Sequence, residues 1–316
     1  MTESDARTAV VALGGNALSP PGERSTIADQ FRHTRESLAP IVELALDGWR
    51  LCIVHGNGPQ VGDELVRNEL ARADVEPLPL GILVGATAGW IGYMIQQSLE
   101  NALRIAGSSR RVTTIITQVV VDPADPALRT PSKFIGHAVP ESRGKALVSE
   151  GQALRIDANG MYRRVVGSPA PQSIHDLPII RQLVESETIV IACGGGGVPV
   201  YVDPHRGLEG VDAIVDKDAA ASVLARELDA ELLVILTNVD AVYADWGKPS
   251  RRKLPHLSVD EARSLDEQKS FGEGSMAPKV RAAMEYVTAT AGRAVIAALE
   301  QGMDAVRGRA GTTIAR

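Results

Sequence analysis

The chain has 316 residues, 44% of them hydrophobic and 3% aromatic, and a formal net charge of −6. This length suits one large α/β domain or two closely joined lobes. The negative charge, without a basic tail or a dense block of Lys and Arg, argues against a nucleic-acid or anionic-membrane surface. Scarce aromatics argue against base stacking, and no apolar run reaches the roughly 18 residues that span a bilayer.

The N-terminus lacks the basic and long apolar regions of a secretory signal. The two cysteines, Cys52 and Cys193, lie on or beside apolar strands. Buried free thiols are therefore expected rather than a disulfide, and the chain is expected to be cytoplasmic.

The first half of the chain alternates apolar strands with amphipathic helices, which predicts parallel strands joined by right-handed crossovers. Within the third of these helices, Gly85, Gly89 and Gly92 recur every three to four residues. That spacing suits close packing, either inside a subunit or across a dimer interface. The expected elements are strands at 9–13, 50–54 and 111–121 and helices at 34–47, 59–73 and 82–105.

Residues 122–171 interrupt this alternation with prolines, glycines and charges. Short strand-like pieces remain, so an inserted lid subdomain is expected rather than a disordered linker. The alternation then resumes, and a last helix and strand close the chain. The expected elements are helices at 176–185, 218–228, 258–267 and 278–290 and strands at 188–192, 231–237 and 293–298.

Three apolar strands end in glycine-dense turns. Strand 9–13 runs into Gly14-Gly15-Asn16, strand 50–54 into HGNGPQVG, and strand 188–192 into CGGGGVPV. Glycine permits positive φ and close approach of a ligand, and free N–H groups after a strand attract anions. If the three strands share one rim of a sheet, the turns predict a phosphate site. The alternative is that each glycine only turns the chain.

The common nucleotide fingerprints are missing. Neither G-x-x-x-x-G-K-[ST] nor a fitting G-x-G-x-x-G occurs, which argues against a P-loop enzyme and a dinucleotide Rossmann dehydrogenase. The six histidines show no metal-ligand spacing, and no nucleophile elbow is present. Only seven of the 33 basic residues are lysine, so each lysine invites a functional explanation.

Eight motifs lie in order along nearly the whole chain. They are LGGNAL (13–18), HGNGPQVG (55–62), TQVVVDPADPA (117–127), PSK (131–133), CGGGGVPV (193–200), VDKDAAAS (215–222), LTNVDAVY (236–243) and GSMAPK (274–279). Together they closely resemble the carbamate kinases of the amino acid kinase family. The resemblance implies a three-layer αβα sandwich around a mainly parallel sheet, with a protruding lid subdomain, usually as a homodimer. The implied reaction is reversible phosphoryl transfer from ATP to carbamate, giving ADP and carbamoyl phosphate with Mg²⁺, in arginine breakdown.

The same resemblance implies that Lys133, Lys217 and Lys279 meet the phosphates and that Asp218 orients the lysines. The scarcity of lysine in this chain supports retained chemistry over solvated charges, because Lys and Arg differ as phosphate ligands. Asp216 and Asp218 open a helix, so a plain helix cap is the alternative for both.

The N-terminal half is expected to bind the acceptor and the part from about 210 to 316 the nucleotide. The expected acceptor residues are Gly14, Gly15, Asn16, Gly56, Asn57 and Gly58, mostly through backbone N–H groups, with Gly195 and Gly196. The expected nucleotide residues are Asp216, Thr237, Asn238, Asp240, Tyr243 and Met276. Asp240 could instead be a turn residue and Met276 simple core. His55 is expected to shape its turn rather than act as a base, because carbamate is already an anion.

The chain departs from the family pattern around the lid. Phe134 and His137 stand where prolines are usual, Gly167 and Ala170 where Pro and Lys are common, and GATAGWIG (85–92) also differs. These changes touch the acceptor side, so a related kinase for another small carboxylate, phosphate or phosphonate stays open. A catalytically silent nucleotide-binding protein is the other alternative. Retention of the lysines and Asp218 argues against it.

Overall fold

The computed structural model describes residues 7–14, 26–157, 159–272 and 276–316. At its centre lies an eight-stranded sheet in which every neighbouring pair is parallel except β16 with β17. In sheet order the strands are β15 (His256–Ser258), β17 (Thr312–Ala315), β16 (Arg293–Ala298), β12 (Leu232–Thr237), β1 (Thr8–Leu13), β2 (Arg50–His55), β9 (Ile189–Ile191) and β3 (Val112–Thr114).

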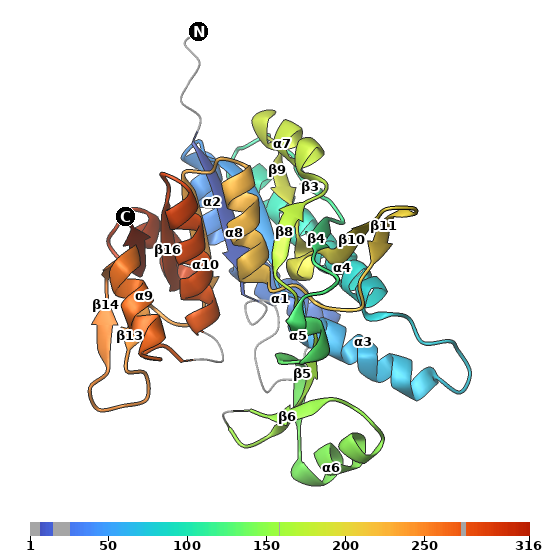
Figure 1. Ribbon diagram of the computed structural model, residues 1–316. Coiled ribbons are helices and arrows are strands. Elements are labelled where there is room, and N and C mark those ends of the chain that lie inside the picture. The colour runs from blue at the N-terminus through green and yellow to red at the C-terminus, as the bar shows by residue number, and fades with distance from the viewer. Residues whose placement is uncertain (1–6, 15–25, 158, 273–275) are drawn as a thin grey trace.

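Helices cover both faces of this sheet, so its central strands are apolar on both sides (Figure 1). Successive residues of β1 point to opposite cores: Val10 packs in one and Val11 in the other. One face carries α1 (Ile27–Glu36), α2 (Ala39–Leu46), α4 (Leu80–Ile105) and α11 (Gly302–Val306), beside η3 (Leu299–Gln301). The other face carries α7 (Leu177–Glu185), α8 (Lys217–Glu227), α9 (Val259–Glu267) and α10 (Met276–Ala289). The predicted three-layer αβα sandwich is confirmed.

Smaller sheets extend from this sandwich. One has the order β11-β10-β4-β8, and another, β5-β7-β6, protrudes with α6 at the bottom of Figure 1. A hairpin of β13 and β14 projects at the lower left of Figure 1. The bounds are α3 (Gly58–Ala71), β4 (Gln118–Val121), α5 (Pro126–Arg129), β5 (Lys133–Val139), α6 (Glu141–Ser149), β6 (Leu154–Ile156), β7 (Tyr162–Val166), β8 (Pro171–Ile174), η2 (Gly194–Gly196), β10 (Val198–Asp203), β11 (Gly207–Gly210), β13 (Val242–Ala244) and β14 (Arg252–Leu254).

Two sequence expectations were wrong. The helix expected at 34–47 is two helices, because Pro40 begins a new first turn and α1 starts earlier, at a capping box of Thr26 and Asp29. The strand expected at 111–121 divides between β3 and β4, which belong to different sheets. A β-branched run predicts extended backbone without specifying its partner strand.

The glycines of α4 pack inside the subunit. A Cβ on Gly92 would lie 2.2 Å from Cγ2 of Thr114 on β3, and one on Gly85 would lie 3.5 Å from the Val198 side chain. Small residues therefore let α4 approach the edge strand of the central sheet. Among the described residues, no helix is long and apolar enough to cross a membrane.

Candidate active site at the carboxyl ends of the strands

The strands that lead into the three glycine turns lie side by side. The turns follow β1, β2 and β9, which are consecutive, parallel neighbours in the central sheet. β12, which ends at Thr237, is the next strand on the other side of β1. The carboxyl ends of these strands therefore form one rim, where ligands bind in open α/β sheets.

In the first two turns, the N–H groups expected to hold the acceptor are only partly free. The Gly14 N–H donates to the carbonyl of Leu236 at 3.1 Å, and the Gly56 N–H donates to that of Leu13 at 3.2 Å. The expectation that these two groups donate to a ligand is therefore wrong, because both extend the sheet hydrogen bonding past the strand ends. Gly15 and Asn16 lie outside the described residues.

The second turn continues directly into α3. Asn57 is the N-cap residue of α3, but its side chain does not cap the helix. A Cβ on Gly58, the first residue of α3, would lie within 4 Å of no atom among the described residues. A helix N-terminus without a side-chain cap presents N–H groups and a positive dipole end to an anion.

The Asn57 amide points away from the cap, toward α4. Its Nδ2 donates to Oγ1 of Thr87 at 2.9 Å, and that hydroxyl donates to the carbonyl of Leu83 at 2.7 Å. Asn57 and Thr87 are both buried. Thr87 belongs to the segment that departs from the family pattern, and nothing in the sequence indicates its contact with the second glycine turn.

The third turn is a buried wedge. Cys193 (φ 50°) and Gly195 to Gly197 all have positive φ, and residues 193–197 are buried. A Cβ on Gly194 would lie 2.6 Å from Nε2 of His55, and one on Gly195 would lie 2.2 Å from Nδ2 of Asn57. One on Gly196 would lie 2.2 Å from the Val215 carbonyl oxygen. This turn therefore fills the space between the second turn and the chain that enters α8.

His55 lies in this contact as a neutral ring. It is fully buried, and its Nδ1 lies 3.1 Å from the Gly56 carbonyl oxygen, which assigns the ring proton to Nδ1. Its Nε2 has no hydrogen-bond partner among the described residues. Burial is the main cause that lowers the pKa of His55 to about 4. A ring that stays neutral between the two turns agrees with the expectation that His55 shapes its turn.

Charged groups concentrate at the start of α8. Asp218 lies between two lysines: it accepts from Lys217 through Oδ1 and from Lys279 of α10 through Oδ2, the latter at 3.0 Å. Their side chains are 4%, 12% and 14% exposed, in the order Asp218, Lys217, Lys279. One carboxylate thus fixes two ammonium groups on different helices.

A second pair adjoins this cluster. Asp216 caps α8, with Oδ1 accepting from the N–H of Asp218 at 2.8 Å, and its Oδ2 accepts from Nζ of Lys133 at 2.5 Å. Lys133 comes from β5, so the protruding lobe reaches the start of α8. Asp216 therefore caps α8, as the alternative interpretation expected, and it also pairs with Lys133. Three lysines face two carboxylates here, which leaves one excess positive charge.

Neighbouring lysines keep both carboxylates charged. Burial raises the pKa of Asp218, but the neighbouring ammonium groups of Lys217 and Lys279 outweigh it, and its pKa is lowered. The same balance holds for Asp216. Burial raises its pKa, but the neighbouring Lys133 ammonium outweighs burial, and the pKa falls well below its usual range. Burial lowers the pKa of Lys217, with Asp218 opposing the shift.

Two of the residues expected to hold the nucleotide, Asp240 and Tyr243, come directly after β12. The Tyr243 hydroxyl donates to Asp240 at 3.0 Å, and Lys253 Nζ donates to the same carboxylate at 2.8 Å. The guanidinium of Arg251 lies 4.5 Å from the Tyr243 ring centroid and 4.8 Å from that of Trp246. Asp240 therefore has side-chain partners beyond the role of a turn residue.

Three other expected nucleotide residues have simpler surroundings. Met276, at the start of α10, packs against the hydrophobic core, as its alternative interpretation expected. Thr237 ends β12, and its hydroxyl donates to the Asn238 side chain at 3.3 Å.

The departures from the family pattern have partners of their own. Phe134 lies under the Arg163 guanidinium, 5.4 Å from it, and Nε2 of His137 is 3.2 Å from an oxygen of Asp63 on α3. The Ala170 N–H donates to Asp125 at 2.9 Å. A Cβ on Gly167 would lie 3.2 Å from the Cα of Leu128.

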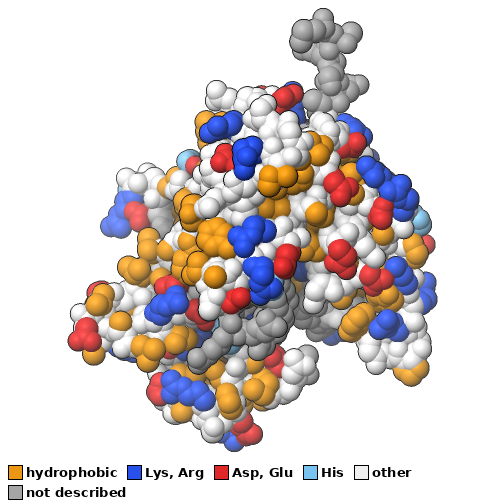
Figure 2. Space-filling model, turned by 180° about the vertical axis from the view of Figure 1, so that it is seen from behind, with side chains coloured by type: hydrophobic (Ala, Val, Ile, Leu, Met, Phe, Trp, Pro, Cys, Tyr) orange, Lys and Arg blue, Asp and Glu red, His pale blue; other side chains and the backbone are white. Residues whose placement is uncertain are grey.

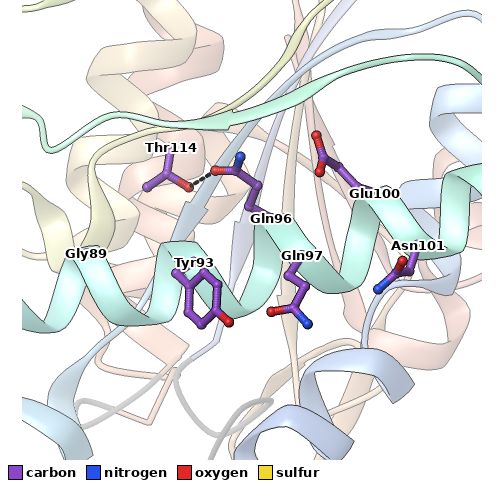
Figure 3. Close-up of a pocket in the computed structure, with 7 residues that line it drawn as sticks. All are labelled: Gly89, Tyr93, Gln96, Gln97, Glu100, Asn101 and Thr114. Atoms are coloured by element: carbon purple, nitrogen blue, oxygen red, sulfur yellow. Dashed lines mark hydrogen bonds between the residues drawn. The ribbon is translucent and has the colours of Figure 1, made fainter.

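A separate pocket lies along α4. Its lining contains none of the expected site residues, and within it Thr114 donates to Gln96 at 3.0 Å (Figure 3). Tyr93 in this pocket is 58% exposed. The lining residues are Gly89, Tyr93, Gln96, Gln97, Glu100, Asn101 and Thr114.

Comparison with known proteins identifies the family to which this fold and site belong. The sequence profile of the amino acid kinase family matches residues 7–298. The chain belongs to the amino acid kinase family. It is 40% identical to carbamate kinase of Pyrococcus horikoshii over 308 residues, which cover 96% of this chain and 98% of the relative. It is 43% identical to carbamate kinase of Escherichia coli over 310 residues, which cover 98% and 99%.

A solved structure agrees with the family assignment. Carbamate kinase from Giardia lamblia bound to AMP-PNP superposes with a TM-score of 0.89 at 34% identity and covers 98% of this chain and 99% of that one. The resemblance that the eight motifs indicated is therefore confirmed at the level of the family.

Proposed function

We propose that this chain is an ATP:carbamate phosphotransferase, which transfers a phosphoryl group reversibly between ATP and carbamate to give ADP and carbamoyl phosphate. The observation that carries the proposal is the buried cluster in which Asp218 holds Lys217 and Lys279 at the start of α8. Its position beside three adjacent glycine turns suits phosphoryl transfer, which needs in-line positioning and charge stabilisation. Similarity to carbamate kinases over nearly the full length supports carbamate as the acceptor.

In this proposal the lysines stabilise charge that develops on the transferring group. Lys217 and Lys279 are preorganised, because Asp218 fixes both ammonium groups before any ligand binds. Lys133 reaches the same place from the lid and exchanges part of its contact with Asp216 for phosphate oxygens. The excess positive charge of the five-residue cluster attracts the anionic substrates.

The acceptor binds at the second glycine turn, at the N-terminus of α3, where the Asn57 side chain does not cap the helix. Asn57 and the neutral His55 shape this turn, and Gly195 and Gly196 pack behind it or face the phosphates. Carbamate has four heavy atoms, and the best small ligands gain about 1.5 kcal/mol per atom, so its dissociation constant is no tighter than tens of micromolar. Thr87 holds Asn57 and is therefore a candidate for setting acceptor choice.

The nucleotide binds along the part from about residue 210 to the C-terminus, with ribose and base toward Asp240 and Tyr243. Mg²⁺ accompanies the nucleotide and shields its phosphate charge. The donor set fits an ion held mainly by phosphate oxygens and water, because Asp216 and Asp218 already pair with lysines. Residues 122–171 serve as the lid subdomain of one kinase domain.

We also propose an oligomeric state and a cellular role for this enzyme. A homodimer would bury the outer face of α4 with its exposed Tyr93, and hydrophobic side chains gather in places on the face of the molecule seen from behind (Figure 2). The enzyme works in the cytoplasm, in arginine breakdown and in the direction of ATP synthesis.

The test is formation of ATP from ADP and carbamoyl phosphate in a coupled assay. Lys217→Ala is expected to lower the rate by two to three orders of magnitude, about 3–4 kcal/mol in the barrier. Lys248→Ala is the matched control, because Lys248 is exposed and its ion pair with Asp245 is a local one. Folded wild-type protein that forms no ATP would refute the carbamate assignment. A panel of carboxylate, phosphate and phosphonate acceptors would then reveal a related kinase.

A further inference from the structure

The protruding lobe, which consists of β5, β6, β7 and α6, contacts α3 at two levels along that helix. At the first level two glycines meet: a Cβ on Gly62 of α3 would lie 2.1 Å from the Cα of Gly136 on β5. Gly136 has φ +63°, so both positions require the absence of a side chain. One residue further along each element, Asp63 lies 3.2 Å from His137. Strand β5 therefore crosses α3 in direct backbone contact.

At the second level, an ion pair joins the lobe to the far end of α3. Arg164 of β7 donates from both terminal nitrogens to both carboxylate oxygens of Glu69, with Nη2 to Oε2 at 2.5 Å, and Nη1 also contacts Gln152. The side chains of Arg164 and Glu69 are 15% and 27% exposed. A forked, half-buried pair of this kind fixes orientation as well as distance.

The lobe held in this way carries Lys133 at the start of β5. Arg164 and Lys133 lie on paired strands, because Lys133 is opposite Val166 and Ile135 is opposite Arg164 in the β5–β7 register. Lys133 in turn reaches Asp216 at the start of α8. The lobe is therefore fixed at two places, by α3 on one side and by the α8 cap on the other.

We propose that Glu69 and Arg164 are positioning residues that set Lys133 over the transferring phosphate, an inference that rests on the proposed kinase function. The ion pair joins two separate parts of the chain, so it restricts the lobe as a body rather than stiffening it internally. Because α3 begins at the second glycine turn, the pair also couples the acceptor side of the site to the lid. Neither residue is placed to touch the substrates.

The experiment compares Glu69→Gln and Arg164→Met with Glu64→Gln and Arg67→Met. The control pair, Glu64 with Arg67, is also an ion pair of α3 but lies wholly within that helix. We expect the first two variants to lose about tenfold in kcat, as misplacement of a catalytic group by a fraction of an ångström does. The KM for ADP, which binds on the other side, is expected to stay unchanged, and the controls to keep wild-type kcat.

The decisive arm uses Lys133→Met as the background. If Glu69 acts through Lys133, then Glu69→Gln lowers kcat no further once Lys133 is gone. An equal loss in both backgrounds would overturn the proposal and leave the pair a structural one. Equal kcat in Glu69→Gln and wild type would overturn it as well.

Hydrogen exchange over residues 133–166 reads the same contact without turnover. Faster exchange in Glu69→Gln than in Glu64→Gln is expected, and equal exchange would show that the pair does not restrain the lobe. Hydrogen exchange therefore separates a failure of the positioning proposal from a failure of the proposed kinase function. Wild-type protein without kinase activity, but with the expected exchange difference, would refute the proposed function while leaving the mechanical link intact.

Discussion

Two clusters near the rim use the same chemistry in opposite surroundings. Asp218 with Lys217 and Lys279 is buried, whereas Asp240 with Lys253 and Tyr243 is largely exposed, the Asp240 side chain at 43% against 4% for Asp218. The pKa of Asp240 is lowered chiefly by its hydrogen bond with Lys253, while burial dominates the surroundings of Asp218 and is outweighed by lysines.

This difference indicates where rigidity is required. Water can replace either partner of the exposed pair at little free-energy change, so such pairs contribute about 0–1 kcal/mol. A buried cluster cannot exchange its partners for water, and removing one leaves the others uncompensated. We therefore expect the chemistry to depend on the Asp218 cluster and the Asp240 cluster to tune nucleotide binding.

The largest expected effect comes from Asp218→Ala. It leaves two buried ammonium groups without their shared counter-charge, so the free energy of unfolding is expected to fall by about 3–5 kcal/mol. ATP formation is expected to fall on the order of 10³-fold. Denaturant unfolding and the coupled assay measure the two. Asp240→Ala is the same change on the exposed side. If both variants behaved alike, burial would not distinguish the clusters.

Lys217→Arg sharpens the comparison without removing a charge. The ammonium of Lys217 is enclosed between Asp218 and the rim, and a planar guanidinium needs more room and different hydrogen-bond directions. We expect a loss of about 10²-fold in kcat, of the kind that misplacing a catalytic group produces. Lys253→Arg should keep most of the activity because Lys253 is 42% exposed. Full activity of Lys217→Arg would show that only charge matters there.

The buried side of the site also contains a neutral side chain, His55, and the pH dependence of stability tests whether it is neutral. The pKa of His55 is about 4 in the folded protein, below its ordinary value of 6.5. Between these values the unfolded chain binds a proton that the folded chain does not, so stability falls as pH drops from 7 to 5, by about 2 kcal/mol from this residue. Asp216 and Asp218 do not contribute in this window, because their lowered pKa values matter only below about 4.

Denaturant unfolding at pH 7 and pH 5 provides the measurement. His55→Gln is expected to lose most of the pH-dependent difference, whatever its effect on stability at pH 7. His205→Gln, an exposed residue beside β11, is the control and should keep the wild-type difference. An unchanged pH dependence in His55→Gln would mean that the ring titrates normally and is not enclosed by the third turn.

The sequence predicted much of this site, and its limits are physical. Strand periodicity and glycine turns indicated that β1, β2 and β9 could share one rim, and the structure confirms it, because these parallel neighbours end on the same side of the sheet. The use made of each N–H was not predictable: Gly14 and Gly56 donate across strands, and strand pairing is a tertiary property. Thr87, Glu69 and Arg164 were missed for the same reason, since their partners are distant in sequence.

The smallest expected effect comes from Tyr243→Phe, which removes only the hydroxyl that donates to Asp240. Lys253 still holds the carboxylate, and the site is half exposed, so stability should change by less than about 1 kcal/mol. If the Asp240 cluster orients the nucleotide, the KM for ADP rises about threefold while kcat stays constant, because binding is lost equally in ground and transition states. Tyr93→Phe on α4 is the control. A fall in kcat at constant KM would instead assign this exposed cluster to the chemical step, and the division between a rigid buried side and a tuning exposed side would fail.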